Sequence, residues 1–256
     1  MALGSNVPED RRNKMPPCSA VIAAAGASRR MGGEDKLFAD ICGAPVLAHS
    51  LAAFQNCGYI NEIVVVTRED KLELVGAICR IYSIGKASKI IVGGPTRQES
   101  VLLGVLAVSK KARLIAIHDG ARPCADMSVI SGAVEAAAKF HAAAPGVPVS
   151  STVKRAKSGI VTGTVDRDGL FEIQTPQVFA AELIKAALTS AVKKGVSVTD
   201  DCMAAELIGA PIRITEGSRY NIKITAVEDL AIAKAILAPS SGGISTTFGG
   251  AATRKR

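Results

Sequence analysis

A short stretch of small and basic residues carries the strongest chemical signal in this sequence. Residues 24–33 read Ala-Ala-Gly-Ala-Ser-Arg-Arg-Met-Gly-Gly, and a lysine follows at position 36. Small residues let the backbone approach phosphate oxygens closely, and exposed N–H groups form an anion site. Because Arg29, Arg30 and Lys36 add positive charge, the stretch predicts a triphosphate site. It matches neither the Walker A pattern nor the GxGxxG fingerprint, so a glycine-rich turn with solvated arginines explains these residues equally well.

A second candidate site lies where an apolar run ends in His118-Asp119-Gly120-Ala121-Arg122-Pro123. In open α/β sheets, ligands bind outside the carboxyl ends of the strands, so Asp119 and Arg122 are placed for function. A carboxylate there suits Mg²⁺, which prefers oxygen ligands and usually bridges phosphates. The simpler alternative is that Asp119 caps the next turn and forms a salt bridge with Arg122. We expect His118 to be a packed core histidine and not a catalyst.

The segments that must position these residues alternate between apolar runs and helical patterns. The apolar runs lack the alternation of half-exposed strands, so we expect strands buried on both faces at 20–25, 62–67, 89–92 and 113–118. Apolar residues at helical spacing predict crossover helices at 45–55, 71–81, 97–110 and 127–142. This order predicts a single-domain, Rossmann-like α/β fold with a mostly parallel sheet covered by helices.

The pattern changes after Pro148. Residues 152–165 are rich in Lys, Arg, Gly and Thr and lack a long apolar face, which predicts a projecting β-arm over about residues 150–168. The sequence then predicts helices at 180–194, 200–207 and 226–237, and short strands near 212–215 and 221–224. We expect one domain over 18–238, a flexible N-terminal extension over 1–17 and a disordered tail over 239–256.

The composition is that of a globular protein whose excess charge is spread out. Of 256 residues, 48% are hydrophobic and 21% charged, and no apolar run reaches the ~20 residues of a membrane span. The net charge is +8, but aromatic residues are only 4%, which disfavours nucleic-acid binding. The six cysteines form no CxxC pair, and residues 1–17 contain no apolar signal segment. We therefore expect reduced core thiols, no membrane association and a cytoplasmic location.

Taken together, the motifs resemble one family. In order they read Ala-Ala-Gly-x-x-Arg-Arg-Met, Lys, Gly-Gly-x-x-Arg-x-x-Ser, His-Asp-x-Ala-Arg-Pro, Thr-Val-x-Arg, Thr-Val-Asp-Arg, Thr-Pro-Gln, Thr-Asp-Asp and Asn-Ile-Lys-Ile-Thr. From about residue 19 to residue 237 the chain resembles the 2-C-methyl-D-erythritol 4-phosphate cytidylyltransferases, which use CTP in the non-mevalonate isoprenoid pathway. The resemblance implies a nucleotidyltransferase fold and transfer of CMP to this polyol phosphate with release of pyrophosphate.

The resemblance also implies roles on the nucleotide side of the site. Arg30, Lys36 and Lys223 would stabilise charge on the α-phosphate during the reaction. The residues that would bind the nucleotide are Ala24, Ala25, Gly26, Gly94, Ser100, Asp119 and Gly120. Asp119 would also lie beside the metal, Mg²⁺ or another divalent cation.

On the acceptor side, the resemblance implies a homodimer that exchanges arms. The residues that would bind the polyol phosphate are Arg122, Thr152, Arg167, Thr175 and Thr199, with Thr152 and Arg167 supplied by the partner's arm. The acceptor's phosphate would attack the α-phosphorus of CTP in line. A phosphate monoester is largely ionised at pH 7, because its second pKa is about 6, so no general base is required.

Two other functions compete with this one. A cytidylyltransferase for another polyol phosphate, such as D-ribitol 5-phosphate, has the same fold and a similar nucleotide loop. The basic pI of 9.3 also permits a non-catalytic protein that senses nucleotides or binds nucleic acid. Turnover with each acceptor separates these functions.

Overall fold

The fold is built on one mixed sheet. The computed structural model describes residues 15–26 and 35–238 of the chain. The strands of this sheet are β1 (Cys18–Ala24), β4 (Ile60–Thr67), β5 (Ala87–Val92), β6 (Leu114–Asp119), β7 (Ala142–Pro148), β10 (Phe171–Ile173), β11 (Gln177–Ala180) and β12 (Arg213–Glu216). The strand order is β10-β7-β11-β6-β1-β4-β5, and β12 pairs with β7. The described helices are α2 (Val46–Asn56), α3 (Leu72–Ile81), α4 (Arg97–Ala107), α5 (Met127–Phe140), α6 (Ala181–Lys193), α7 (Asp201–Glu206) and α8 (Glu228–Leu237), with a short 3-10 turn at Glu69–Lys71.

The centre of the sheet is parallel and buried on both faces. β1 pairs in parallel with β4 and with β6, and β4 pairs in parallel with β5. Within β1, Ile22 packs against the core on one face of the sheet and Val21 against the core on the other. β11 runs antiparallel to both β6 and β7, so β7 has the same direction as β6 and most strands of the sheet run the same way. The predicted fold class is confirmed, because continuous apolar strands require cover on both faces.

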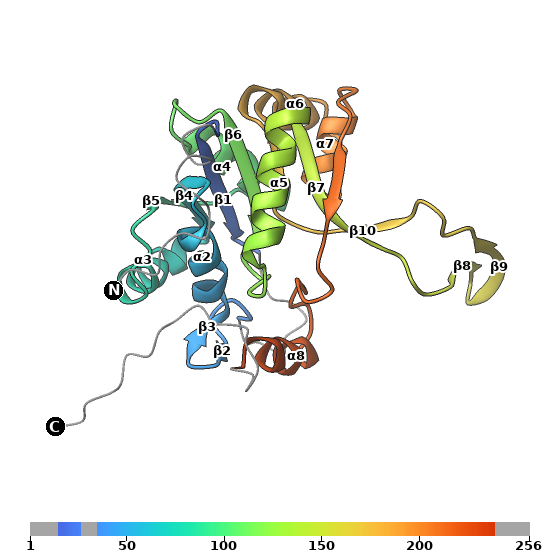
Figure 1. The fold of residues 1–256 in the computed structure, drawn as a ribbon, viewed down its shortest axis with the longest axis horizontal. Coiled ribbons are helices and arrows are strands. Elements are labelled where there is room, and N and C mark those ends of the chain that lie inside the picture. Colours follow the sequence, from blue (N-terminus) through green and yellow to red (C-terminus); the bar gives the residue numbers. More distant parts are fainter. Residues whose placement is uncertain (1–14, 27–34, 239–256) are drawn as a thin grey trace.

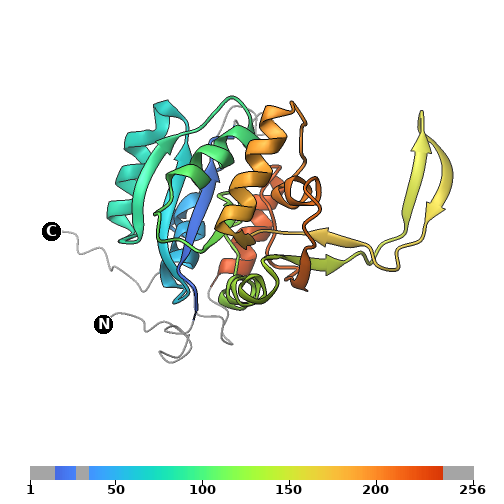
Figure 2. The same cartoon turned by 90° about the horizontal axis from the view of Figure 1, so that it is seen from above.

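Helices form a layer on each face, as the perpendicular views show (Figures 1 and 2). Buried side chains of α2, α3 and α5 belong to one core cluster, and those of α4, α6 and α7 belong to the other.

α4 begins at a capping box, in which the Thr96 hydroxyl accepts from the Glu99 N–H and the Glu99 carboxylate accepts from the Thr96 N–H. It then lies directly on β1, since a Cβ on Gly104 would come 2.5 Å from Val21 Cγ1. The capping box and the glycine together fix where α4 presents its first turn.

The arm is a separate hairpin. β8 (Val153–Lys157) and β9 (Ile160–Val165) pair only with each other and project away from the body (Figures 1 and 2). Its base is anchored where β10 pairs with β7, with Phe171 opposite Pro148. Ile160 is 72% exposed and Val161 58% exposed, so the tip carries apolar side chains in solvent. The predicted arm is therefore present in the structure.

Three predictions of local structure were wrong. The segment 89–92 is not buried on both faces, because β5 is an edge strand and is largely half-buried or exposed. The helix predicted at 127–142 ends at Phe140, where His141 takes a left-handed conformation, and β7 follows. Residues 221–224 form no strand, because their polar groups bond to neighbouring loops individually instead of forming a ladder.

The last helix belongs to a third, smaller apolar cluster. α8 packs with the small hairpin of β2 (Asp40–Ile41) and β3 (Ala44–Pro45), and their shared apolar cluster includes Ile41, Ile224 and Ala233.

All six cysteines are free, but Cys42 is exposed, so not every one is the core thiol that we expected. No helix in the described ranges is both long and apolar enough to cross a bilayer. Of the predicted extensions at 1–17 and 239–256, residues 1–14 and all of 239–256 lie outside the described residues.

Candidate active site

A cavity of about 420 Å³ opens at the carboxyl ends of the central strands. β1 and β6 are in register with Ala23 opposite Asp119, so the loops that leave both strands border the same space. Seven of the predicted site residues line it: Ala25, Gly26, Lys36, Gly94, Ser100, Asp119 and Lys223. These residues come from five separate segments, and the sheet order brings them together, as expected for a ligand site of an open α/β sheet.

Asp119 is the electrostatic centre of this cavity. Its carboxylate, at the end of β6, is 10% exposed and lies 2.7 Å from Lys223 Nζ, 3.3 Å from an Arg97 nitrogen and 3.8 Å from Arg122 Nε. Burial alone would raise the pKa of Asp119, but the three cations outweigh it and hold that pKa well below its usual range. Asp119 is therefore ionised at every physiological pH.

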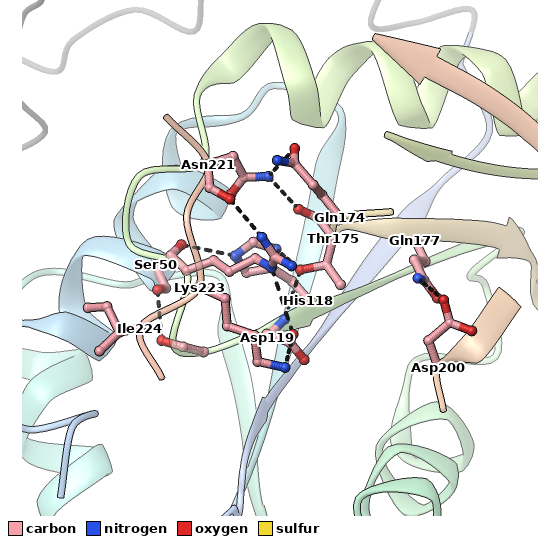
Figure 3. A network of polar contacts seen from close by, with 12 residues as sticks. Ser50, His118, Asp119, Gln174, Thr175, Gln177, Asp200, Asn221, Lys223 and Ile224 are labelled. Atoms are coloured by element: carbon pink, nitrogen blue, oxygen red, sulfur yellow. Dashed lines mark hydrogen bonds and ion pairs between the residues drawn. The ribbon is translucent and has the colours of Figure 1, made fainter. Parts of the chain in front are cut away.

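The two described lysines of the predicted catalytic set converge on one segment. Lys36 Nζ donates to the carbonyl of Ile224 at 2.8 Å, and Lys223 reaches Asp119 from the adjacent residue (Figure 3). The segment is held in turn by Asn221, which is fully buried and donates to the carbonyl of Thr175 at 2.9 Å. Two ammonium groups thus lie at the cavity from segments far apart in the sequence.

A glycine pair shapes the opposite wall. A Cβ on Gly93 would lie 2.6 Å from the Cβ of Ala25 and 2.7 Å from Ser100 Oγ, so only glycine allows this approach of the two loops. Ser100 Oγ donates to the carbonyls of Gly94, at 3.1 Å, and Thr96, at 2.8 Å. The main chain of this wall is therefore fixed next to the loop that follows β1.

Behind Asp119, a chain of hydrogen bonds fixes its backbone. The Asp119 N–H donates to Thr175 Oγ1 at 3.2 Å, and Thr175 Oγ1 lies 2.9 Å from His118 Nδ1 (Figure 3). His118 Nε2 lies 3.2 Å from the carbonyl of Arg122, which can only accept, so Nε2 carries the proton and Nδ1 accepts from Thr175. Burial lowers the pKa of His118 to about 4. The histidine is neutral and packed against Phe54, which confirms its expected role in the core.

Sequence reasoning missed a second support of Asp119. Arg97, in the first turn of α4, donates to both oxygens of Asp201 at 3.2 and 2.9 Å and also contacts Asp119. Asp201 is 0% exposed, and burial raises its pKa despite the arginine. The carbonyl oxygen of the Gln177 side chain accepts from the Asp201 and Cys202 N–H groups at 3.0 and 2.9 Å. The motifs contained this signal, because Thr-Asp-Asp supplies Asp201, the buried partner of Arg97, and Thr-Pro-Gln supplies Gln177, which holds the backbone of Asp201.

A second cavity, of about 380 Å³, adjoins the first through one shared residue. Lys223 borders both cavities, and Arg122, Glu172 and Arg219 line only the second among these charged groups. Arg122 is fixed by donation to the carbonyl of Asn221 at 2.6 Å. A phosphate in this second cavity would approach the first across Lys223.

The other predicted residues lie apart from these cavities or outside the described ranges. Ala24 is buried in the core and Gly120 packs against the carbonyl of Ala23, so both flank the site through the backbone. Thr152 and Arg167 lie on the exposed arm, where Arg167 donates to the carbonyl of Ser150. Thr199 is exposed before α7, with its hydroxyl 3.7 Å from Met203 Sδ. Arg29 and Arg30 fall within 27–34, which the structure does not describe.

Comparisons with known proteins point to one family. The family model described as 2-C-methyl-D-erythritol 4-phosphate cytidylyltransferase matches residues 18–239. A protein of that name from Halalkalibacterium halodurans is 43% identical over 221 residues, which cover 86% of this chain and 96% of that protein. Another, from Pelotomaculum thermopropionicum, is 38% identical over 239 residues, which cover 92% of this chain and 100% of that protein.

Solved structures are similar in fold. The crystal structure of 4-diphosphocytidyl-2C-methyl-D-erythritol synthase from Anaerococcus prevotii matches with a TM-score of 0.76 and 30% identity, covering 86% of this chain and 98% of that one. The crystal structure of 2-C-methyl-D-erythritol 4-phosphate cytidylyltransferase from Thermus thermophilus matches with a TM-score of 0.72 and 30% identity, covering 85% and 96%. The match therefore extends over nearly the whole of each relative.

Proposed function

The chain belongs to the 2-C-methyl-D-erythritol 4-phosphate cytidylyltransferase family, and from this premise we propose how its residues divide the work of cytidylyl transfer. The enzyme is a nucleotidyltransferase of non-mevalonate isoprenoid precursor synthesis. It transfers CMP from CTP to 2-C-methyl-D-erythritol 4-phosphate, giving 4-diphosphocytidyl-2-C-methyl-D-erythritol and pyrophosphate. We assign this reaction to the first cavity because Lys36, Lys223 and Asp119 all line it.

CTP binds in the first cavity. Lys36 and Lys223 lie where they can neutralise the charge that grows on the α-phosphate as it becomes five-coordinate. The resemblance to the family assigns the same role to Arg30, which lies outside the described residues. The backbone of Ala25, Gly26 and Gly94 lines the same cavity, and small residues there let the nucleotide approach closely. The described side chains offer cations and hydrogen-bond donors, so catalysis consists of positioning and charge stabilisation.

Asp119 orders the cations and is the carboxylate that would hold Mg²⁺. Among the described residues no group of three or more His, Cys, Asp or Glu side chains could hold a metal, and Asp119 already contacts three cations. Asp119 would supply one carboxylate ligand to Mg²⁺, which suits the preference of that ion for oxygen. When bound, the ion would neutralise part of the triphosphate charge. The contact with Asp119 also holds the Lys223 ammonium at the boundary between the two cavities.

The acceptor binds in the second cavity, beside Arg122. Its phosphate is already ionised near neutral pH, since the second pKa of a monoester is about 6, and it attacks the α-phosphorus directly. The nucleophile then needs to be held in line with the leaving pyrophosphate, which is work for cations on both sides of the reacting atoms. Lys223 meets this requirement because it borders both cavities.

We expect the assay for pyrophosphate release with CTP to separate the possible acceptors. Turnover with 2-C-methyl-D-erythritol 4-phosphate should exceed turnover with D-ribitol 5-phosphate, and CTP should exceed UTP. Faster turnover with D-ribitol 5-phosphate would contradict the assignment of the acceptor. CTP binding without pyrophosphate release, for either acceptor, would indicate a nucleotide sensor instead.

The arm supports a homodimer in which each site is shared between chains. Thr152 and Arg167 flank the β8–β9 hairpin, which projects from its own body (Figure 2), so these residues are available to a second copy of the chain. Ile160 and Val161 are exposed on the same hairpin and would be covered by a partner. A location in the cytoplasm fits the six free cysteines, because thiols persist in reducing compartments.

Mixing two inactive variants tests the exchanged arm. Arg167→Ala chains should restore activity to Lys36→Ala chains, because in a mixed dimer one of the two sites combines an intact body with an intact arm. Random mixing would restore about a quarter of the wild-type specific activity, given closed twofold dimers. If each arm served its own chain, no intact site could form in any mixture. Mass spectrometry of the native dimers confirms that mixing has occurred.

A further inference from the structure

Arg219 is a charged residue of the second cavity that neither the motifs nor the described network explains. It lies in the loop between β12 and the segment that carries Lys223, and it lines the cavity with Arg122 and Glu172. Its guanidinium is exposed and lies 3.5 Å from the hydroxyl of Ser150, a residue at the base of the arm. The side chain therefore reaches from the body toward the place where the arm leaves it.

The cations around this cavity differ in how they are neutralised. Lys223 and Arg122 each contact the carboxylate of Asp119, and Arg122 also donates to a backbone carbonyl. Arg219 has no carboxylate oxygen within 4 Å in the described part of the chain. It is thus the cation of this cavity whose charge is most available to an anion from solution.

We propose that Arg219 binds the phosphate group of the polyol phosphate acceptor and is a determinant of acceptor affinity supplied by the same chain as Lys223. The inference deepens the function proposed above and rests on it. An arginine suits this role because its planar guanidinium offers paired donors to phosphate oxygens. The shared position of Lys223 then sets the direction of binding, with the acceptor's phosphate toward the nucleotide cavity.

Glu172 adds a negatively charged residue to this cavity of mostly positive charge. Glu172 lines the same space, and its carboxylate would repel a phosphate there and accept hydrogen bonds from polyol hydroxyls. An acceptor whose phosphate lies at Arg219 and Lys223 would direct its hydroxyls toward Glu172. The arrangement fits a small polyol that carries one anionic end.

Steady-state kinetics of Arg219→Ala test the proposal. KM for the polyol phosphate should rise about 10-fold, since a charge-assisted hydrogen bond is lost, while KM for CTP and kcat change less than twofold. Arg219→Lys should recover part of the affinity because it retains the charge. The matched control is Arg213→Ala, an exposed arginine on β12 whose guanidinium lies over the Phe140 ring and away from both cavities. Both KM values should stay unchanged in this control.

The outcomes are distinguishable. Unchanged KM for the acceptor in Arg219→Ala would overturn the proposal, and so would an equal rise in both KM values. Weaker dimerisation of Arg219→Ala in sedimentation experiments, with unchanged KM once the dimer is saturated, would assign the residue to the partner's arm and also overturn it. If the wild-type enzyme itself released no pyrophosphate with the polyol phosphate, the proposed function would fail, independently of Arg219.

Discussion

Replacing Lys223 with alanine is expected to lower kcat about 10²- to 10³-fold, the usual cost of removing one group that stabilises transition-state charge. The ammonium of Lys223 lies 2.7 Å from Asp119 Oδ2, and Lys223 borders both cavities. Its charge therefore acts near the α-phosphorus, where one P–O bond forms and another breaks. The dissociation constant for CTP should change much less than kcat, because the α-phosphate gains charge only during the reaction. Rapid-quench kinetics and calorimetric titration with CTP measure the two quantities separately.

The matched control for this variant is Lys234→Ala. Lys234 is an exposed lysine in the last turn of α8 that lines neither cavity, and its loss should leave kcat unchanged. A Lys223→Ala enzyme that kept most of its turnover would exclude the lysine from the reaction. Equal losses in both variants would point to a general effect of charge and not to a local one.

Replacing Arg97 with alanine is expected to lower both stability and turnover. Asp201 is fully buried and would be left without its cation, which costs about 3 kcal/mol of unfolding free energy, at the lower end for buried pairs because Arg97 is itself 34% exposed. Asp119 would lose one of its three cations, and loss of such supporting contacts lowers activity about 10-fold or more. Thermal unfolding and kcat report the two effects.

The double variant Arg97→Ala/Asp201→Asn separates the two effects. A neutral amide needs no counter-ion, so stability should recover, but turnover should stay low because Asp119 still lacks the Arg97 contact. Recovery of turnover together with stability would show that Arg97 matters only for folding. Asp201→Asn alone, with Arg97 retained, measures the cost of the amide itself.

The pH dependence of Arg97→Ala follows from the same carboxylate. Burial already raises the pKa of Asp201, and removing the arginine removes the main opposing influence, so the folded protein would hold the proton at a higher pH than the unfolded chain does. The folded state then binds more protons, and the stability of the variant rises as pH falls through the folded pKa toward about 4. Asp119 acts in the opposite direction, because its pKa is lowered in the folded state. Its contribution to the stability of the fold is complete above pH about 4 and is lost as the pH falls below that value. Melting temperatures between pH 4 and 8 should therefore show the deficit of the variant shrinking toward acid.

The fold could be predicted where sequence pattern and burial coincide. β1, β4 and β6 are continuous apolar runs covered on both faces, and they were predicted within a few residues. β7 was missed because its Ala-Ala-Ala start continues a helical composition, and only pairing with β10, β11 and β12 makes it a strand. The exposure of β5 could not be inferred from its own residues, since it follows from a place at the edge of the sheet.

The site could be predicted only in part for a related reason. Lys36, Asp119 and Lys223 were expected together from the order of the family's motifs, and each lines the first cavity. The contact of Arg97 with Asp201 joins residues 104 positions apart, and a Thr-Asp-Asp sequence before a helix predicts a cap, which describes Asp200 and not its neighbour. Which of two adjacent aspartates is buried depends on how α7 packs against α6, information that no local pattern contains.

One ammonium group forms a common wall of both cavities, and this has a consequence for inhibitors. A compound with an anionic group at each end, long enough to pass across Lys223, would exclude nucleotide and acceptor at once. Such a bisubstrate analogue gains from linkage, because its second contact is made at high effective concentration. A substitution of Lys223 that weakens binding of this analogue would also remove the lysine from the reaction. Resistance at this position would therefore reduce the enzyme's own activity.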